Sequence, residues 1–231
     1  MKFPAAAILS FLLLPLMAGA GLASPLPEHV SEYQAAKAPE GARHLCRNYP
    51  WACGEATAAP LLQETEILAA AHEVNLAVNR QVRPERDRDN YGMAENWTLP
   101  AGNRGDCEDY ALLKKKLLIE RGVPAERLLL AVVIKGNLEP HVVLLFRGED
   151  ADYLLDNMTD AMLPWRLSGY TVVKMQSAED QSLWSAVLLG PLATRQNGPQ
   201  LAAAPVLEER QVAAAEARTG SRDLGAGRRH Y

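Results

Sequence analysis

The middle of this 231-residue chain holds a cysteine, a histidine and an aspartate whose order suits nucleophilic catalysis. Cys107 sits in the run Arg-Gly-Asp-Cys-Glu-Asp-Tyr, His141 follows 34 residues later, and Asp156 follows 15 residues after that. They supply a soft nucleophile, a base that titrates near neutral pH and a carboxylate that can orient the base. Many chains of this size contain all three residue types, so only their positions can indicate a catalytic site.

The residues after Cys107 predict a helix that begins at the cysteine. Apolar residues at helical spacing run through residues 108–121, and a Gly-x-Pro sequence then stops the helix. Asp106 is a candidate N-cap, with Asp109 in the place of a capping-box partner. Unpaired backbone N–H groups and the positive end of the dipole at a helix start favour a thiolate and can hold a substrate oxyanion. This position therefore suits a nucleophile.

Apolar runs rich in β-branched residues predict strands at residues 128–135, 141–147 and 152–156. A two-residue hairpin turn at 148–149 would pair Arg147 with Asp150, and His141 would then face Asp156. Facing Cβ atoms lie about 4.5–5.5 Å apart in an antiparallel pair, which suits an imidazole–carboxylate hydrogen bond. A turn one residue longer would shift the register by one residue and spoil the match.

Each of these residues also has a purely structural interpretation. Cys107 can be a small core residue in an apolar helix, Asp106 and Asp109 can be capping residues, and His141 can be a buried histidine with its hydrogen bonds satisfied. The combination of a cysteine at a helix start with a facing His–Asp pair favours a catalytic site.

Further motifs surround these residues over about residues 74–170. They are Asn79, Arg88-Asp89-x-Tyr91-Gly92, Trp97, Gly105-Asp106-Cys107-Glu108-Asp109-Tyr110-Ala111, Gly122-Val123-Pro124, His141-x-Val143-Leu144 and Leu155-Asp156-Asn157. With them the chain resembles the bacterial transglutaminase-like cysteine proteinases, the family that includes the LapG-type periplasmic adhesin proteases. The resemblance implies an α+β fold with a papain/transglutaminase-like core, in which a helix carrying the cysteine packs on an antiparallel sheet carrying the histidine and aspartate.

The same resemblance implies roles for the site residues. Cys107 would be the nucleophile, His141 the general base and acid, and Asp156 the orienting carboxylate. Calcium would bind next to the nucleophile through Asp106 and Glu108. Calcium takes about six to eight oxygen ligands, so backbone carbonyls, waters or the nearby Asp109 would have to complete its shell. The alternative is a helix cap beside a solvated glutamate.

Residues 1–24 have the pattern of a secretion signal: Lys2, an apolar stretch over residues 5–17 and a small-residue cleavage site. We therefore expect a periplasmic protein, with secretion or an uncleaved anchor as alternatives, and no stable membrane insertion after signal removal. Export favours disulfides, so we expect a Cys46–Cys53 bridge that leaves Cys107 free. A metal site at the first two cysteines has poor support, because no nearby His/Cys pair completes it.

The sequence predicts four regions: the signal, an N-terminal segment with the disulfide loop (25–60), a peptidase domain (61–190) and a disordered low-complexity tail (191–231). Further elements expected in the domain are a helix at 61–82, a solvated charged loop at 83–89 and strands at 171–175 and 183–189. The net charge of −4 gives no indication of a nucleic-acid partner.

These observations predict an exported cysteine peptidase that cleaves a protein of the periplasm or outer membrane. The same three residues could instead transfer an acyl group to an amine, as a transglutaminase or amidase does. A non-catalytic calcium-dependent binding module and a structural calcium clamp are further alternatives. An inner-membrane regulator is known for adhesin-releasing relatives, and the sequence leaves open whether this chain has one.

Overall fold

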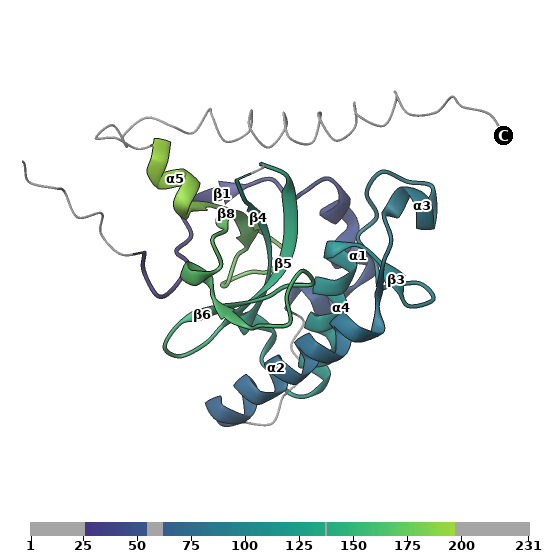
Figure 1. Cartoon of the computed structure of the whole chain (residues 1–231), viewed down its shortest axis with the longest axis horizontal. Helices are drawn as coiled ribbons and strands as arrows, with labels where there is room; N and C mark the ends of the chain where they lie inside the picture. Colours follow the sequence, from purple (N-terminus) through teal and green to yellow (C-terminus); the bar gives the residue numbers. More distant parts are fainter. Residues whose placement is uncertain (1–25, 55–61, 137, 197–231) are drawn as a thin grey trace, which may run out of the picture.

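The computed structural model describes residues 26–54, 62–136 and 138–196, with side chains described up to Ala193 (Figure 1). The expected signal segment and the tail beyond residue 196 lie outside these ranges. The first residues assigned to the tail, Pro191–Gln196, form the helix α5. Within the described ranges, no helix has the length and apolar character needed to cross a membrane.

One antiparallel sheet of seven strands forms the centre of the molecule. In spatial order its strands are β1 (Gln34–Ala36), β9 (Trp184–Leu189), β8 (Thr171–Gln176), β4 (Leu128–Ile134), β5 (Pro140–Arg147), β6 (Asp152–Leu155) and β7 (Leu163–Pro164). A second, parallel pair joins β2 (Arg83–Pro84) to β3 (Arg104–Gly105). The strands predicted from the apolar runs are therefore all present.

Two helices, α2 (Glu64–Gln81) and α4 (Cys107–Glu120), lie side by side and pack against the central strands (Figure 1). The shorter helices are α1 (Leu45–Asn48), α3 (Asp87–Tyr91) and the 3-10 turns η1 (Gly41–His44), η2 (Pro50–Cys53), η3 (Ala125–Arg127) and η4 (Trp165–Leu167). Helices and an antiparallel sheet thus form the α+β fold that the sequence predicted.

Both faces of the central strand β4 are buried. Leu128 and Leu130 belong to the core shared with α2 and α4, whereas Leu129 and Ala131 belong to a second core on the opposite face. Val30 and Trp165 cover this second face, and the Trp165 indole N–H lies 3.1 Å from the carbonyl oxygens of Pro27 and Glu28. A strand buried on both faces reads as a continuous apolar run, which explains the sequence Leu-Leu-Leu-Ala-Val-Val-Ile.

The predicted register of the β5–β6 hairpin is wrong by two residues. Arg147 pairs with Asp152, not Asp150, and Leu144 pairs with Leu155, so Asp156 lies just beyond β6 and is not the direct partner of His141. The connection is longer than two residues, and Gly148 N–H donates to the Ala151 carbonyl to close it. A shift of two residues preserves the face on which each side chain lies, so His141 and Asp156 become diagonal neighbours on the same face.

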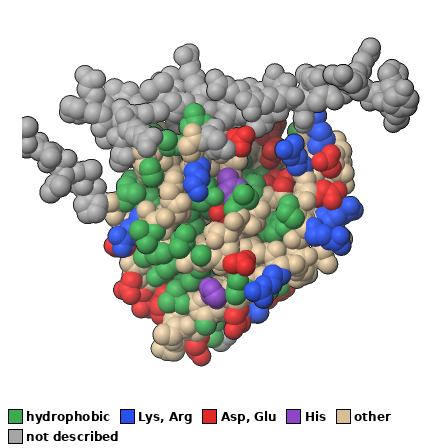
Figure 2. All heavy atoms as spheres, in the orientation of Figure 1, with side chains coloured by type: hydrophobic (Ala, Val, Ile, Leu, Met, Phe, Trp, Pro, Cys, Tyr) green, Lys and Arg blue, Asp and Glu red, His purple; other side chains and the backbone are tan. Residues whose placement is uncertain are grey.

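The expected disulfide is present between Cys46 and Cys53, whose Cα atoms lie 5.4 Å apart, and it leaves Cys107 as a free thiol. On the face in Figure 2, acidic and basic side chains are interspersed near the α3 end of the molecule. This mixture agrees with the small net charge of the chain.

Candidate active site

Cys107 is the first residue of α4, where the sequence predicted it. Its Sγ accepts a hydrogen bond from the backbone N–H of Val142 at 3.4 Å, so it lies against β5 beside His141. The thiol also donates to Glu108 Oε2 at 3.2 Å. Burial and the Glu108 carboxylate raise the pKa of this thiol, opposite to the direction expected from a helix start alone.

His141 and Asp156 form a direct pair, with Nε2 of the imidazole 2.8 Å from Oδ1 of the carboxylate. The same Oδ1 accepts the backbone N–H of Met158 at 2.9 Å, and Oδ2 accepts the Tyr170 hydroxyl at 2.9 Å. Burial alone would raise the pKa of Asp156, but the histidine, the Met158 N–H and the tyrosine outweigh it and lower the pKa. The carboxylate is therefore held charged beside the imidazole.

Helix α2 also holds the backbone carbonyl of Asp156 through a hydrogen bond. Asn79 Nδ2 donates to the carbonyls of Asp156 and Thr159, both at 3.0 Å. One turn earlier, Asn75 Nδ2 donates to the carbonyl of Asp160 at 3.1 Å. Two amides at i and i+4 on one helix face thus fix the loop that carries the carboxylate.

The predicted capping box at the start of α4 is absent, and the described residues provide no side-chain cap for this helix. Asp106 Oδ2 instead accepts the backbone N–H of Asp87 at 3.1 Å, and Asp109 Oδ1 accepts that of Thr98 at 3.2 Å. Gly105 allows Asp109 this position, because a Cβ there would lie 2.4 Å from Asp109 Oδ2. Both acids therefore bind the preceding segment and do not cap the N–H groups of the first helical turn.

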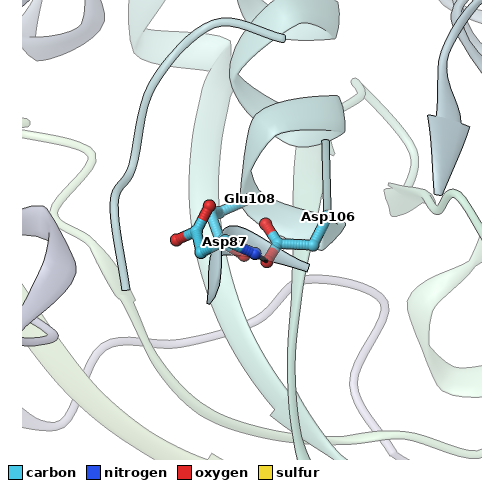
Figure 3. Close-up of side chains that lie close together, drawn as sticks. All are labelled: Asp87, Asp106 and Glu108. Carbon is cyan, nitrogen blue, oxygen red and sulfur yellow. Dashed lines mark hydrogen bonds between the residues drawn. The ribbon is translucent and has the colours of Figure 1, made fainter. Parts of the chain in front are cut away.

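Three carboxylates converge at the start of α4 (Figure 3): Asp87, Asp106 and Glu108. Each offers an oxygen within 4.8 Å of the others. One oxygen of each is buried with no hydrogen-bond partner in the described part of the chain. Burial and repulsion by Asp106 raise the pKa of Asp87 to about 6, and the same two causes, with Glu95, raise that of Glu108 well above its usual range. The three residues have the composition of a cation site.

Asp87 is the acidic residue that the sequence interpretation missed. The solvated loop expected at 83–89 instead contains β2 and the start of α3, and Asp87 is buried there while Asp89 on the same helix is exposed. The backbone N–H of Asn96 donates to the Asp87 carboxylate. Nothing in the alternating charges of this stretch distinguishes the two aspartates before folding.

Asp109, the other candidate for completing the metal shell, lies outside this group. Its second oxygen faces the Tyr91 hydroxyl at 3.5 Å, and burial and Asp106 raise its pKa to about 8. Tyr170, which the sequence analysis also left without a role, does contact the predicted pair through Asp156.

Known proteins resemble this chain in sequence and in fold. The sequence model of the family described as bacterial transglutaminase-like cysteine proteinase (BTLCP) matches residues 32–190. A search of the curated proteins gives no significant match. Among solved structures, calcium-bound LapG of Legionella pneumophila is 24% identical, with 66% of this chain and 80% of that chain covered and a TM-score of 0.45. EGTA-treated LapG of the same organism is 24% identical, with 63% and 79% covered and a TM-score of 0.44.

Proposed function

Since the chain belongs to the bacterial transglutaminase-like cysteine proteinases and is a cysteine peptidase, we propose that Cys107, His141 and Asp156 are its catalytic residues. The observation that supports this proposal most directly is the 2.8 Å pair between His141 Nε2 and Asp156 Oδ1, formed beside a free thiol at a helix start. Because Nε2 is committed to Asp156, Nδ1 is the nitrogen through which His141 would exchange a proton with the thiol.

In this scheme Cys107 Sγ attacks the carbonyl carbon of a peptide bond after His141 has accepted its proton. Backbone N–H groups of the first turn of α4 hold the oxyanion. Protonated His141 then gives its proton to the amine nitrogen as the C–N bond breaks, which leaves a thioester on Sγ. Water, deprotonated by His141, hydrolyses the thioester and restores the thiol. Asp156 keeps the imidazole in the required tautomer.

Calcium binding at Asp87, Asp106 and Glu108 is part of the proposal. Their unpartnered buried oxygens and crowded negative charge fit a hard divalent cation, with backbone carbonyls or waters as the remaining ligands. Bound there, calcium would offset the charge of the acidic group next to the nucleophile and order the start of α4. The predicted ligand pair Asp106 and Glu108 is thus extended by Asp87.

The proposed substrate is a protein of the periplasm or outer membrane, reached after export through the signal pattern at residues 1–24. The Cys46–Cys53 disulfide supports an oxidising compartment. We further propose one peptidase domain that ends near Gly190 and is followed by the low-complexity tail. Regulation by an inner-membrane protein remains part of the hypothesis.

The test uses protein lacking residues 1–24, incubated with an envelope protein extract and calcium, with new N-termini identified by mass spectrometry. Wild-type protein should produce new N-termini, and both Cys107→Ala and His141→Ala should produce none. His72→Ala is the matched control, because His72 is exposed on α2 and should leave cleavage unchanged.

Equal cleavage by wild type and Cys107→Ala would refute the scheme. Incorporation of a labelled primary amine without new N-termini would show that an amine, not water, resolves the thioester. Calcium-dependent retention of an envelope protein without either product would favour the binding module.

A further inference from the structure

We propose that Tyr170 is a positioning residue that holds the Asp156 carboxylate and the His141 ring in their reactive arrangement. The inference rests on the proposed function, because it gives Tyr170 a role in the reaction only if the His–Asp pair is catalytic. It is carried by contacts of the tyrosine with both members of that pair.

The backbone of Tyr170 is fixed by the conformation of Gly169 and by hydrogen bonds of Ser168. Tyr170 precedes β8, and Gly169 before it adopts φ +75°, a left-handed conformation that suits glycine. The Ser168 hydroxyl accepts the Tyr170 N–H at 3.1 Å and donates to the Trp165 carbonyl at 2.6 Å. The turn that follows the buried Trp165 therefore sets the direction in which the tyrosine enters the site.

The hydroxyl of Tyr170 engages the carboxylate oxygen that the histidine does not use. Oδ1 of Asp156 faces His141 and the Met158 N–H, whereas Oδ2 accepts the tyrosine hydroxyl at 2.9 Å. With partners on both oxygens, the carboxylate cannot rotate about its Cβ–Cγ bond without breaking a charge-assisted hydrogen bond. Burial and the neighbouring carboxylate raise the pKa of Tyr170, so the phenol keeps its proton and remains a donor.

The ring of Tyr170 provides a second constraint, on the imidazole itself. The ring centroids of Tyr170 and His141 lie 5.8 Å apart at an interplanar angle of 33°. Lys135 Nζ lies over the tyrosine ring, 4.9 Å from its centroid. The ring therefore limits rotation of the imidazole and reduces the access of water to the His–Asp hydrogen bond.

The test compares Tyr170→Phe with wild type under identical buffer conditions. Phenylalanine retains the ring and removes only the hydroxyl. Two readouts are used: the rate constant for alkylation of Cys107 by iodoacetamide at neutral pH, and the NMR resonance of the His141 Nε2–H in 15N-histidine-labelled protein. That resonance is assigned by its loss in His141→Ala. Tyr153→Phe is the matched control, because Tyr153 is a partly buried tyrosine on β6 that stacks on Phe146.

Tyr170→Phe should lower the alkylation rate about tenfold or more, since a hydrogen bond to a charged group is lost, and should shift and broaden the His141 resonance. Tyr153→Phe should change neither. In a double variant with Asp156→Asn, Tyr170→Phe should add nothing, because it acts through the carboxylate.

Wild-type reactivity and an unchanged resonance in Tyr170→Phe, with His141→Ala and Asp156→Asn impaired, would overturn the positioning role and leave the proposed function intact. A lower melting temperature with unchanged reactivity would show a structural role only, and additive effects with Asp156→Asn would show that the tyrosine acts elsewhere; either overturns the inference. Wild-type reactivity in His141→Ala and Asp156→Asn would refute the proposed function itself.

Discussion

At the residue scale, the acidic group beside Cys107 is costly unless a cation binds to it. Asp87 and Glu108 are almost completely buried, and one oxygen of each has no hydrogen-bond partner in the described part of the chain. Burial of an uncompensated carboxylate destabilises a fold, so such groups are normally paired or coordinate metals. Helix α3 buries Asp87 and exposes Asp89, so the two aspartates should differ in their effect on calcium binding, which can be measured.

We expect Asp87→Asn to weaken calcium binding by about ten- to hundredfold, because the site loses one of its three charged ligands. Asp89→Asn, an exposed position two residues away on the same helix, removes the same charge and should leave the affinity near that of wild type. Isothermal titration calorimetry of both variants makes the comparison. Equal affinities would exclude Asp87 as a ligand.

The site residues could be predicted from the sequence because it contains both their chemical types and their local context. Cys107 follows a capping-type residue and starts an amphipathic run, and His141 begins an apolar strand. Asp87 and Tyr170 were missed for the opposite reason. Their partners, Asp106 and Asp156, are set by tertiary packing, and no local pattern separates Asp87 from its exposed neighbours or Tyr170 from other tyrosines.

At the scale of elements, the β5–β6 hairpin shows that the strand face of a residue can be predicted even where the turn length is not. The predicted turn was too short by two residues, yet the His141–Asp156 contact formed because side chains alternate with period two. An error of one residue would have placed the two groups on opposite faces. The face of a strand is thus predictable from its apolar pattern, whereas the length of a turn depends on local hydrogen bonds such as Gly148 N–H to Ala151.

Helix α4 carries three consecutive lysines with different surroundings. Lys114 is fully buried, and its ammonium has no hydrogen-bond partner in the described part of the chain. It lies 6.0 Å from the Tyr110 ring centroid. Lys115 is also fully buried but donates to Gln176 and Gln181, whereas Lys116 is about one-third exposed and pairs with Glu120. Three consecutive lysines in the sequence do not reveal this difference.

Lys114→Met should stabilise the protein at neutral pH by about 1–4 kcal/mol, because it removes a buried amine that must either stay charged or lose its proton on folding. Burial lowers the pKa of Lys114 from 10.5 to about 7, despite opposing contributions from Asp156 and Asp160. Between these pH values the unfolded chain holds one more proton than the fold, so the free energy of unfolding rises with pH.

Urea unfolding of wild type and Lys114→Met between pH 7 and pH 10.5 measures this effect. The advantage of the variant should be largest at pH 7 and shrink as pH rises. Lys116→Met is the matched control and should follow the wild-type pH dependence, because its side chain is partly exposed. A pH-independent difference between wild type and Lys114→Met would contradict the assigned titration.

At the scale of the whole molecule, the N-terminal segment is part of the fold and not an appendage. β1 extends the sheet beside β9, and the backbone N–H of Val30 donates to the buried Asp152 carboxylate at 2.8 Å. The sequence analysis set residues 25–60 apart from the peptidase domain as an N-terminal segment. Short strands and extended coverings carry little periodic signal, so their place in the sheet is decided by tertiary contacts.

The disulfide loop in this segment connects the N-terminal residues to the candidate active site. Within the loop, the Tyr49 hydroxyl lies 2.7 Å from Thr98 Oγ1 and accepts the Leu99 N–H at 3.4 Å. The backbone of Thr98 in turn donates to Asp109, two residues from Cys107 along α4. The loop closed by the bridge thus contacts Thr98, two residues after Asn96, whose backbone N–H donates to Asp87 of the acidic group.

Replacement of both Cys46 and Cys53 by serine should therefore have two effects. Opening this short loop should cost about 2–3 kcal/mol of stability, since the unfolded chain gains conformational freedom. It should also weaken calcium binding severalfold, because Tyr49 no longer holds the segment at Thr98 in place.

Tyr49→Phe, which keeps the disulfide and removes the hydroxyl, separates the two effects: it should weaken calcium binding with a smaller loss of melting temperature. Calcium affinity unchanged in both variants would show that the disulfide loop stabilises the fold without supporting the site.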